Sequence, residues 1–83
     1  MNRRKIIDAI LEIIRTISPD SDLTEVKENE PLRDQLDLDS MDFLDIVLEL
    51  RRRYSVDVPE EEYKELVSLE SCVNYLGPKL QFS

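Results

Sequence analysis

The sequence predicts a single all-α domain, a four-helix bundle with a long first loop and a short third helix. Apolar residues recur at three- and four-residue spacing in three segments, which is the pattern of helices that bury one face. No segment alternates apolar and polar residues with a period of two, so no sheet is expected. The 83 residues suit one small domain over 1–83, with an ordered core of about 3–77.

The composition argues against several classes of function. The net charge of −8 disfavours binding to nucleic acid and to anionic membranes, which attract basic proteins. The chain has no histidine, one cysteine and one glycine, so an internal disulfide, a thiolate metal cluster and a glycine-rich phosphate loop are not expected. There is no apolar run of membrane-spanning length and no signal pattern. We therefore expect a cytoplasmic monomer without metal that is not an enzyme.

The first helix is predicted over residues 3–18. Charged residues fall largely on one side of it, and the other side is a wide apolar stripe that should face the core. The Ser18-Pro19 pair should end the helix, because the residue before a proline disfavours the α conformation. The stripe consists of Ile6, Ile7, Ile10, Leu11, Ile13, Ile14 and Ile17.

A long acidic loop is predicted over residues 19–39. Asp20 and Asp22 are spaced as in a calcium-binding loop, but the sixth position is Glu25 instead of glycine and the twelfth is Pro31 instead of glutamate. An EF-hand is therefore rejected in favour of a solvated loop. Apolar side chains should hold this loop against the core, namely Leu23, Val26, Leu32, Leu36 and Leu38.

The second helix is predicted from Ser40 to Arg53. Asp39 suits the N-cap, because its carboxylate can accept a hydrogen bond from a first-turn backbone N–H, and Asp42 can reach back as in a capping box. Ser40 then occupies the first helical position, on the surface. A phosphate bonded to its hydroxyl would be stabilised by free N–H groups and by the helix dipole.

This second helix has two adjacent apolar faces. The face expected in the core consists of Phe43, Ile46, Val47 and Leu50. The other consists of Met41, Leu44 and Leu48. It is either buried in a tight bundle or exposed beside Ser40 as a protein-binding surface. The acidic residues around it are Asp39, Asp42, Asp45 and Glu49.

The remainder of the chain predicts two further helices. Arg51-Arg52-Arg53 should complement the negative end of the second helix. Pro59 should occupy the first position of a short third helix that runs to about Leu66. Ser68 should cap the fourth helix, Gly77-Pro78 should end it, and residues 79–83 should form a frayed tail. The apolar stripe of the fourth helix is Leu69, Cys72, Val73 and Leu76.

The segment Asp39-Ser40-Met41-Asp42 at the start of an amphipathic helix resembles the phosphopantetheine attachment site of acyl carrier proteins. The resemblance extends over about residues 3–77. Further matches are Leu36, Tyr54, the Val-Asp-Val-Pro-Glu-Glu turn at 56–61 and the Val-Asn-Tyr-Leu segment at 73–76. It implies that Ser40, flanked by Asp39 and Met41, carries a phosphopantetheine arm donated by coenzyme A. The thiol of this arm would hold an acyl group as a thioester.

The resemblance also implies partners and a channel. The partners would be a phosphopantetheinyl transferase and the acyl-loading and acyl-using enzymes, which present basic patches. Their expected binding surface comprises Asp39, Met41, Asp42, Leu44, Asp45, Leu48 and Glu49. By analogy with the family's apolar channel, the candidate lining residues are Phe43, Ile46, Val47, Leu50, Leu66 and Cys72. A plain core role is equally good for each of the six.

Two departures from the family pattern lead to a narrower hypothesis. Asp37 replaces a frequent glycine, and Arg51-Arg52-Arg53 replaces a commonly acidic helix end. The arginines would repel partner enzymes whose basic patch reaches this end of the helix. Such repulsion indicates a carrier dedicated to one pathway, and not the general fatty-acid carrier. The alternatives are an aminoacyl or peptidyl carrier and, outside this class, an unmodified helical adaptor in which Ser40 is only part of a helix cap.

Overall fold

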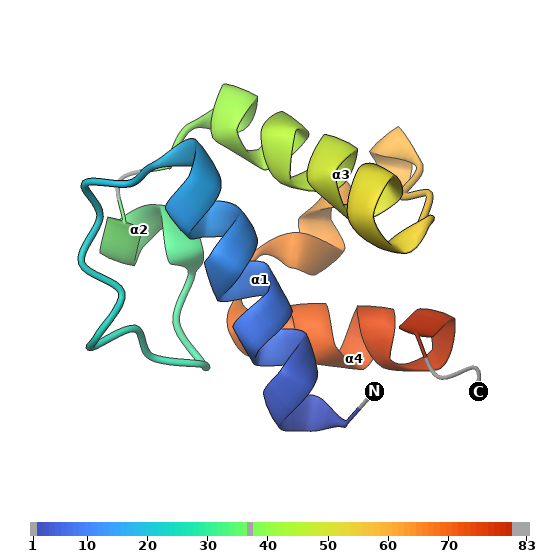
Figure 1. Cartoon of the computed structure of the whole chain (residues 1–83), viewed down its shortest axis with the longest axis horizontal. Helices are drawn as coiled ribbons and strands as arrows, with labels where there is room; N and C mark the ends of the chain where they lie inside the picture. The colour runs from blue at the N-terminus through green and yellow to red at the C-terminus, as the bar shows by residue number, and fades with distance from the viewer. Residues whose placement is uncertain (1, 37, 81–83) are drawn as a thin grey trace.

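The structure, a computed structural model, describes residues 2–36 and 38–80, and these residues form helices and no strand. The all-α prediction is therefore confirmed. In Figure 1, α3 extends along the top of the view and α4 along the bottom, α1 runs diagonally between their left ends, and η1 connects α3 to α4. The elements are α1 (Arg3–Ile17), α2 (Leu32–Leu36), α3 (Ser40–Tyr54), the 3₁₀ helix η1 (Glu60–Leu66) and α4 (Leu69–Leu80).

The core lies where α1 packs against both α3 and α4. Six residues of α1 are buried, and they belong to the predicted stripe except for Ala9. Ile46, Val47 and Leu50 of α3 meet this surface, with Phe43 partly buried beside them. From α4, the buried residues are Leu69, Cys72, Leu76 and Leu80. Packing of the apolar stripes of α1 and α3 fixes which face of α3 is buried. The first residue of α3 is thereby left at the surface.

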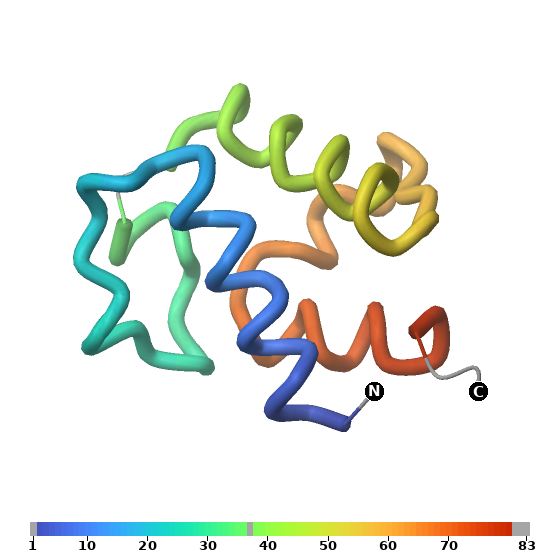
Figure 2. The backbone as a smooth tube through the Cα atoms, in the orientation of Figure 1, coloured from blue at the N-terminus to red at the C-terminus, as the bar shows by residue number. Residues whose placement is uncertain are grey.

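The connection between α1 and α3 contains a helix, α2, that the sequence pattern does not predict. Figure 2 follows this connection along one side of α1. A helix of five residues is too short to display a 3.6-residue period. It is fixed by tertiary contacts, because Leu32 is fully buried and its N–H donates to the carbonyl of Val67 at 2.7 Å. The Gln35 amide also donates to the carbonyls of Lys27 and Glu30.

The helix α4 continues beyond the predicted Gly77-Pro78 stop, so that prediction is wrong. Gly77 has no positive φ, and Pro78 lies inside the last turn. Proline in a helix removes one backbone hydrogen bond. The burial of Leu80, which is 2% exposed, compensates by anchoring the final turn in the core. Lys79 and Leu80 therefore belong to the helix, and residues 81–83 of the predicted tail lie outside the described residues.

The third helix also differs in detail from its prediction. It is a 3₁₀ helix, and Pro59 precedes it as the N-cap residue with an extended backbone instead of occupying the first helical position. Among the described residues, no helix is both long and apolar enough to cross a membrane.

Candidate functional site

The start of α3 is held by the predicted capping box. The Asp42 backbone N–H donates to Asp39 Oδ1 at 3.0 Å, and the Asp39 backbone N–H donates to Asp42 Oδ2 at 3.0 Å. These two bonds satisfy two backbone donors that the first turn would otherwise leave without a partner. The path of the backbone around Ser40 is therefore defined on both sides.

Ser40 is the first residue of α3 and is exposed to solvent. Its hydroxyl forms no hydrogen bond with any residue in the part of the chain that the structure describes. A group bonded to this oxygen would displace no internal contact. The positive end of the helix dipole also favours a negative charge at this position.

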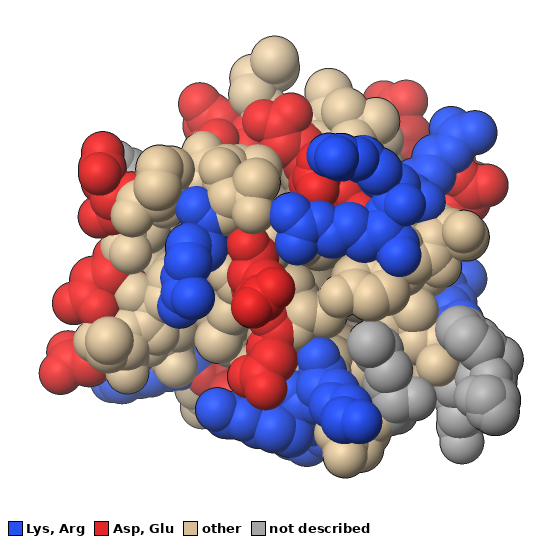
Figure 3. Space-filling view, viewed as in Figure 1, with Lys and Arg blue, Asp and Glu red and all other residues tan. Residues whose placement is uncertain are grey.

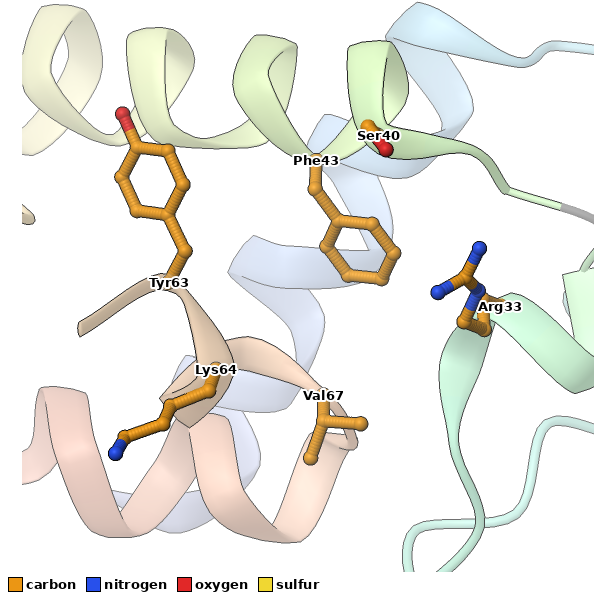
Figure 4. A pocket seen from close by; sticks show the side chains of 6 residues that line it. All are labelled: Arg33, Ser40, Phe43, Tyr63, Lys64 and Val67. Carbon is orange, nitrogen blue, oxygen red and sulfur yellow. The ribbon is translucent and has the colours of Figure 1, made fainter. Parts of the chain in front are cut away.

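A pocket of about 280 Å³ lies beside Ser40, and its lining residues come from α2, α3, η1 and the turn after η1. Figure 4 shows the Phe43 ring pointing into the space between α3 and η1, and the Arg33 guanidinium extending from α2 toward that space. The lining residues are Arg33, Ser40, Phe43, Tyr63, Lys64 and Val67. Sequence reasoning missed four of these, Arg33, Tyr63, Lys64 and Val67, because no motif links residues of three separate elements.

The six candidate channel residues are not all on this pocket. Phe43 lines it, whereas the other five are buried in the hydrophobic core. None of those five is more than 8% exposed. They are brought together as packed core residues, and they are Ile46, Val47, Leu50, Leu66 and Cys72.

The second apolar face of α3 is exposed beside Ser40. Met41 is 66% exposed, Leu44 37% and Leu48 53%, so of the two alternatives left open by the sequence the structure has the exposed one. We call these three residues the α3 strip. Asp45 is exposed next to it, whereas Asp39 and Asp42 are engaged in the capping box.

Glu49, which the sequence placed on the partner-binding surface, is mostly buried and paired with arginines. Its side chain is only 16% exposed and forms ion pairs with Arg53 at 2.8 Å and Arg52 at 3.3 Å. Arg53 also donates to the Thr16 hydroxyl at 3.0 Å, which ties the end of α3 to α1. The Glu49 carboxylate is thus neutralised within the molecule.

The three arginines at the end of α3 lie among acidic side chains. Arg51 pairs with Asp57 at 3.4 Å, in addition to the pairs that Glu49 forms with the other two. Figure 3 shows basic side chains gathered over this end of the molecule with acidic ones beside them. Two of the three positive charges are therefore balanced by Glu49 and Asp57, which leaves one net positive charge among these five side chains, whereas the start of α3 carries carboxylates.

Cys72 is buried in the core on α4, as its place on the predicted stripe indicates. Burial raises the pKa of its thiol to about 12, because the thiolate would lose its hydration. The thiol is therefore protonated at neutral pH and unsuited to act as a nucleophile.

Comparison with known proteins agrees with this geometry. Residues 4–76 match the family model for a phosphopantetheine attachment site. The chain is 31% identical to an acyl carrier protein of Petrotoga mobilis over 81 residues, covering 96% of this chain and 93% of that protein. It is 29% identical to an acyl carrier protein of Rubrobacter xylanophilus over 72 residues, covering 83% and 89%.

The chain therefore belongs to the acyl carrier protein family. The attachment-site domain indicates a covalently bound phosphopantetheine as its prosthetic group. The residues present fit such a group, because the Ser40 hydroxyl is exposed and unbonded, a pocket lies beside it, and Arg33 supplies a positive charge.

Proposed function

We propose that Ser40 carries the phosphopantetheine arm and that the chain delivers an acyl or related carboxylic group to partner enzymes. The observation that carries this proposal is the position of Ser40 at the start of α3. It is exposed, its hydroxyl forms no hydrogen bond with the described residues, and it lies inside a segment that matches the family's attachment site. When bound, the arm supplies a thiol that holds the cargo as a thioester.

The role of Ser40 in attachment is that of a nucleophile in a reaction catalysed by another protein. Its Oγ attacks the β-phosphorus of coenzyme A within a magnesium-dependent transferase. The hydroxyl proton passes to a base of the transferase, and 3′,5′-ADP leaves. The chain has no histidine with which to catalyse this step itself. Asp39 and Asp42 hold the first turn, which keeps Ser40 accessible.

The partner surface consists of the α3 strip and the carboxylates of Asp39, Asp42 and Asp45. Three large apolar side chains next to acidic groups suit partners that combine an apolar patch with basic residues. The net charge of −8 would steer such partners toward the molecule. Glu49 contributes less to this surface than the sequence indicated, because Arg52 and Arg53 neutralise it.

The arginines at the end of α3 support a role in one dedicated pathway. A partner that extends a basic patch to this end would meet positive charge, which lowers affinity for the wrong enzymes. We expect the general fatty-acid enzymes to charge and elongate this protein less efficiently than their usual carrier. The substitution Arg51→Glu should increase this efficiency, since Arg51 is largely exposed and pairs only with the exposed Asp57 among the described residues. Equal efficiency with the usual carrier would contradict the proposal.

The substitution Ser40→Ala tests the carrier function against the adaptor alternative. A carrier loses all activity in a cell that depends on it, while the purified variant retains its helical circular dichroism spectrum. An unmodified adaptor keeps its activity, because the Ser40 hydroxyl forms no hydrogen bond within the described structure. The control is Ser21→Ala in the acidic loop, which removes a hydroxyl remote in sequence from the site. Because this hydroxyl bonds to the Ser18 hydroxyl at 2.7 Å, circular dichroism checks the fold of this variant as well.

A further inference from the structure

We propose that the pocket beside Ser40 is a resting site for the arm, in which Arg33 pairs with the phosphodiester and the apolar wall holds the body of the arm. This inference rests on the proposed attachment to Ser40. It assigns a binding role to Arg33, Tyr63 and Val67, which the sequence did not single out.

The phosphodiester on Ser40 needs a nearby positive charge. It would add a negative charge to a molecule of net charge −8, at a place where Asp39, Asp42 and Asp45 already follow one another. Arg33 lines the same pocket as Ser40 and forms no ion pair with any residue among 2–36 and 38–80. A guanidinium binds phosphate oxygens through two parallel N–H groups. Lys64, the other basic residue of the lining, directs its amine away from Ser40 in Figure 4, so Arg33 is the better placed counter-ion for this group.

The remaining walls of the pocket suit the less polar body of the arm. Phe43 and Tyr63 present aromatic rings, and Val67 is 41% exposed, so that covering it removes apolar surface from water. Figure 4 shows the Lys64 amine pointing away from Phe43, so we assign it no contact. The arm is tethered to Ser40, and even weak contacts with these walls act at a high effective concentration.

The size of the pocket limits what it holds. Its volume of about 280 Å³ lies just below the roughly 300–1,000 Å³ that small-molecule sites occupy. Leu66 and Ile46 of the adjoining elements are fully buried in the packed core. The arm therefore rests across the surface of this pocket, and partner enzymes draw it out from there.

The test is a nuclear magnetic resonance measurement on the holo protein, made with an arm that carries ¹³C-labelled methyl groups. We expect nuclear Overhauser contacts from these methyl groups to the ring protons of Phe43 and Tyr63. The substitution Arg33→Gln should reduce these contacts by about two- to fivefold, as is typical for the loss of one exposed charge pair. The control Arg15→Gln removes the same charge from an exposed residue that does not line the pocket, and should leave the contacts unchanged.

Two kinds of result would overturn this inference but leave the proposed attachment to Ser40 intact. One is a holo protein without contacts between the arm and these rings, which would show that the arm moves freely. The other is an equal effect of Arg33→Gln and Arg15→Gln, or no effect of Arg33→Gln, either of which would remove the role of Arg33. A chain whose mass never increases by the arm would overturn the proposed attachment, and this inference with it.

Discussion

Asp39 combines a structural role with a proposed role in recognition, and two substitutions separate these roles. Asp39→Ala removes the cap of α3 and should lower the free energy of unfolding by about 1 kcal/mol. Asp39→Asn keeps an oxygen acceptor for the Asp42 N–H, so its stability should stay within a few tenths of a kcal/mol of wild type. Because it loses a charge beside Ser40, it should receive the arm several-fold more slowly.

Urea unfolding and the initial rate of arm transfer measure these two effects. Asn and Ala variants with equal stability losses would show that the Asp39 charge, and not its capping bond, supports the helix. A wild-type transfer rate in Asp39→Asn would remove this carboxylate from the transferase-binding surface.

Cys72 should be unreactive in the native protein. With the pKa of the thiol raised to about 12 by burial, roughly one molecule in 10⁴ carries the thiolate at pH 8. Since the chain contains one cysteine, a thiol reagent should modify the native apo protein only as it unfolds. The holo protein should show one rapidly reacting thiol per chain, which persists in Cys72→Ala. Rapid stoichiometric reaction of the apo protein would contradict this assignment.

The same raised pKa predicts a loss of stability at alkaline pH. The folded protein holds the Cys72 proton more tightly than the unfolded chain, whose thiol has the ordinary pKa near 9.0. The stabilising contribution is therefore complete below about pH 9 and is lost as the pH rises toward about 12, by at most about 1.4 kcal/mol per pH unit. Urea unfolding measures the free energy of unfolding at each pH. Its decline with rising pH should be shallower in Cys72→Ala. An unchanged slope would show that other groups, such as Tyr75, account for it.

At the scale of elements, the last turn of α4 provides a direct test of packing. Leu80→Ala should reduce the free energy of unfolding by about 2–4 kcal/mol, because Leu80 is buried in the core. Lys79→Ala is the control in the same turn. It removes only the exposed Lys79 ammonium from its position 4.8 Å above the centre of the Tyr75 ring, and should cost less than about 1 kcal/mol. Similar small losses in both variants would mean that this turn does not contribute to the core.

Prediction from sequence succeeded where a helix has a long apolar stripe. The bounds of α1 and α3 agree with the predictions to within one residue at each end, since each stripe extends over several turns. Prediction from sequence failed for α2, which has only five residues. It also failed for the end of α4, where burial of Leu80 outweighs the Gly77-Pro78 signal for a helix end. The cap and the exposure of Ser40 could be predicted, because they depend on neighbouring residues. The pocket could not, because Arg33, Phe43 and Val67 meet only after folding.

At the scale of the whole molecule, the distribution of charge is organised around α3. The start of the helix carries carboxylates and the exposed α3 strip. Its end carries arginines that form ion pairs with Glu49 and Asp57, and Arg53 also donates a hydrogen bond to the Thr16 hydroxyl. One helix thus presents carboxylates and exposed apolar side chains at the proposed site of attachment, and three arginines that share only two carboxylates at its other end. We propose that this difference in charge along α3 orients partner enzymes on the proposed binding surface.

The central claim, that Ser40 carries the arm, is tested most directly by the intact mass of the protein after incubation with coenzyme A, Mg²⁺ and a broad-specificity phosphopantetheinyl transferase. We expect a mass increase of one phosphopantetheine in the wild type and none in Ser40→Ala. An unchanged wild-type mass with two different transferases, while circular dichroism shows a folded protein, would contradict the claim. An increase that persists in Ser40→Ala would place the arm on another residue.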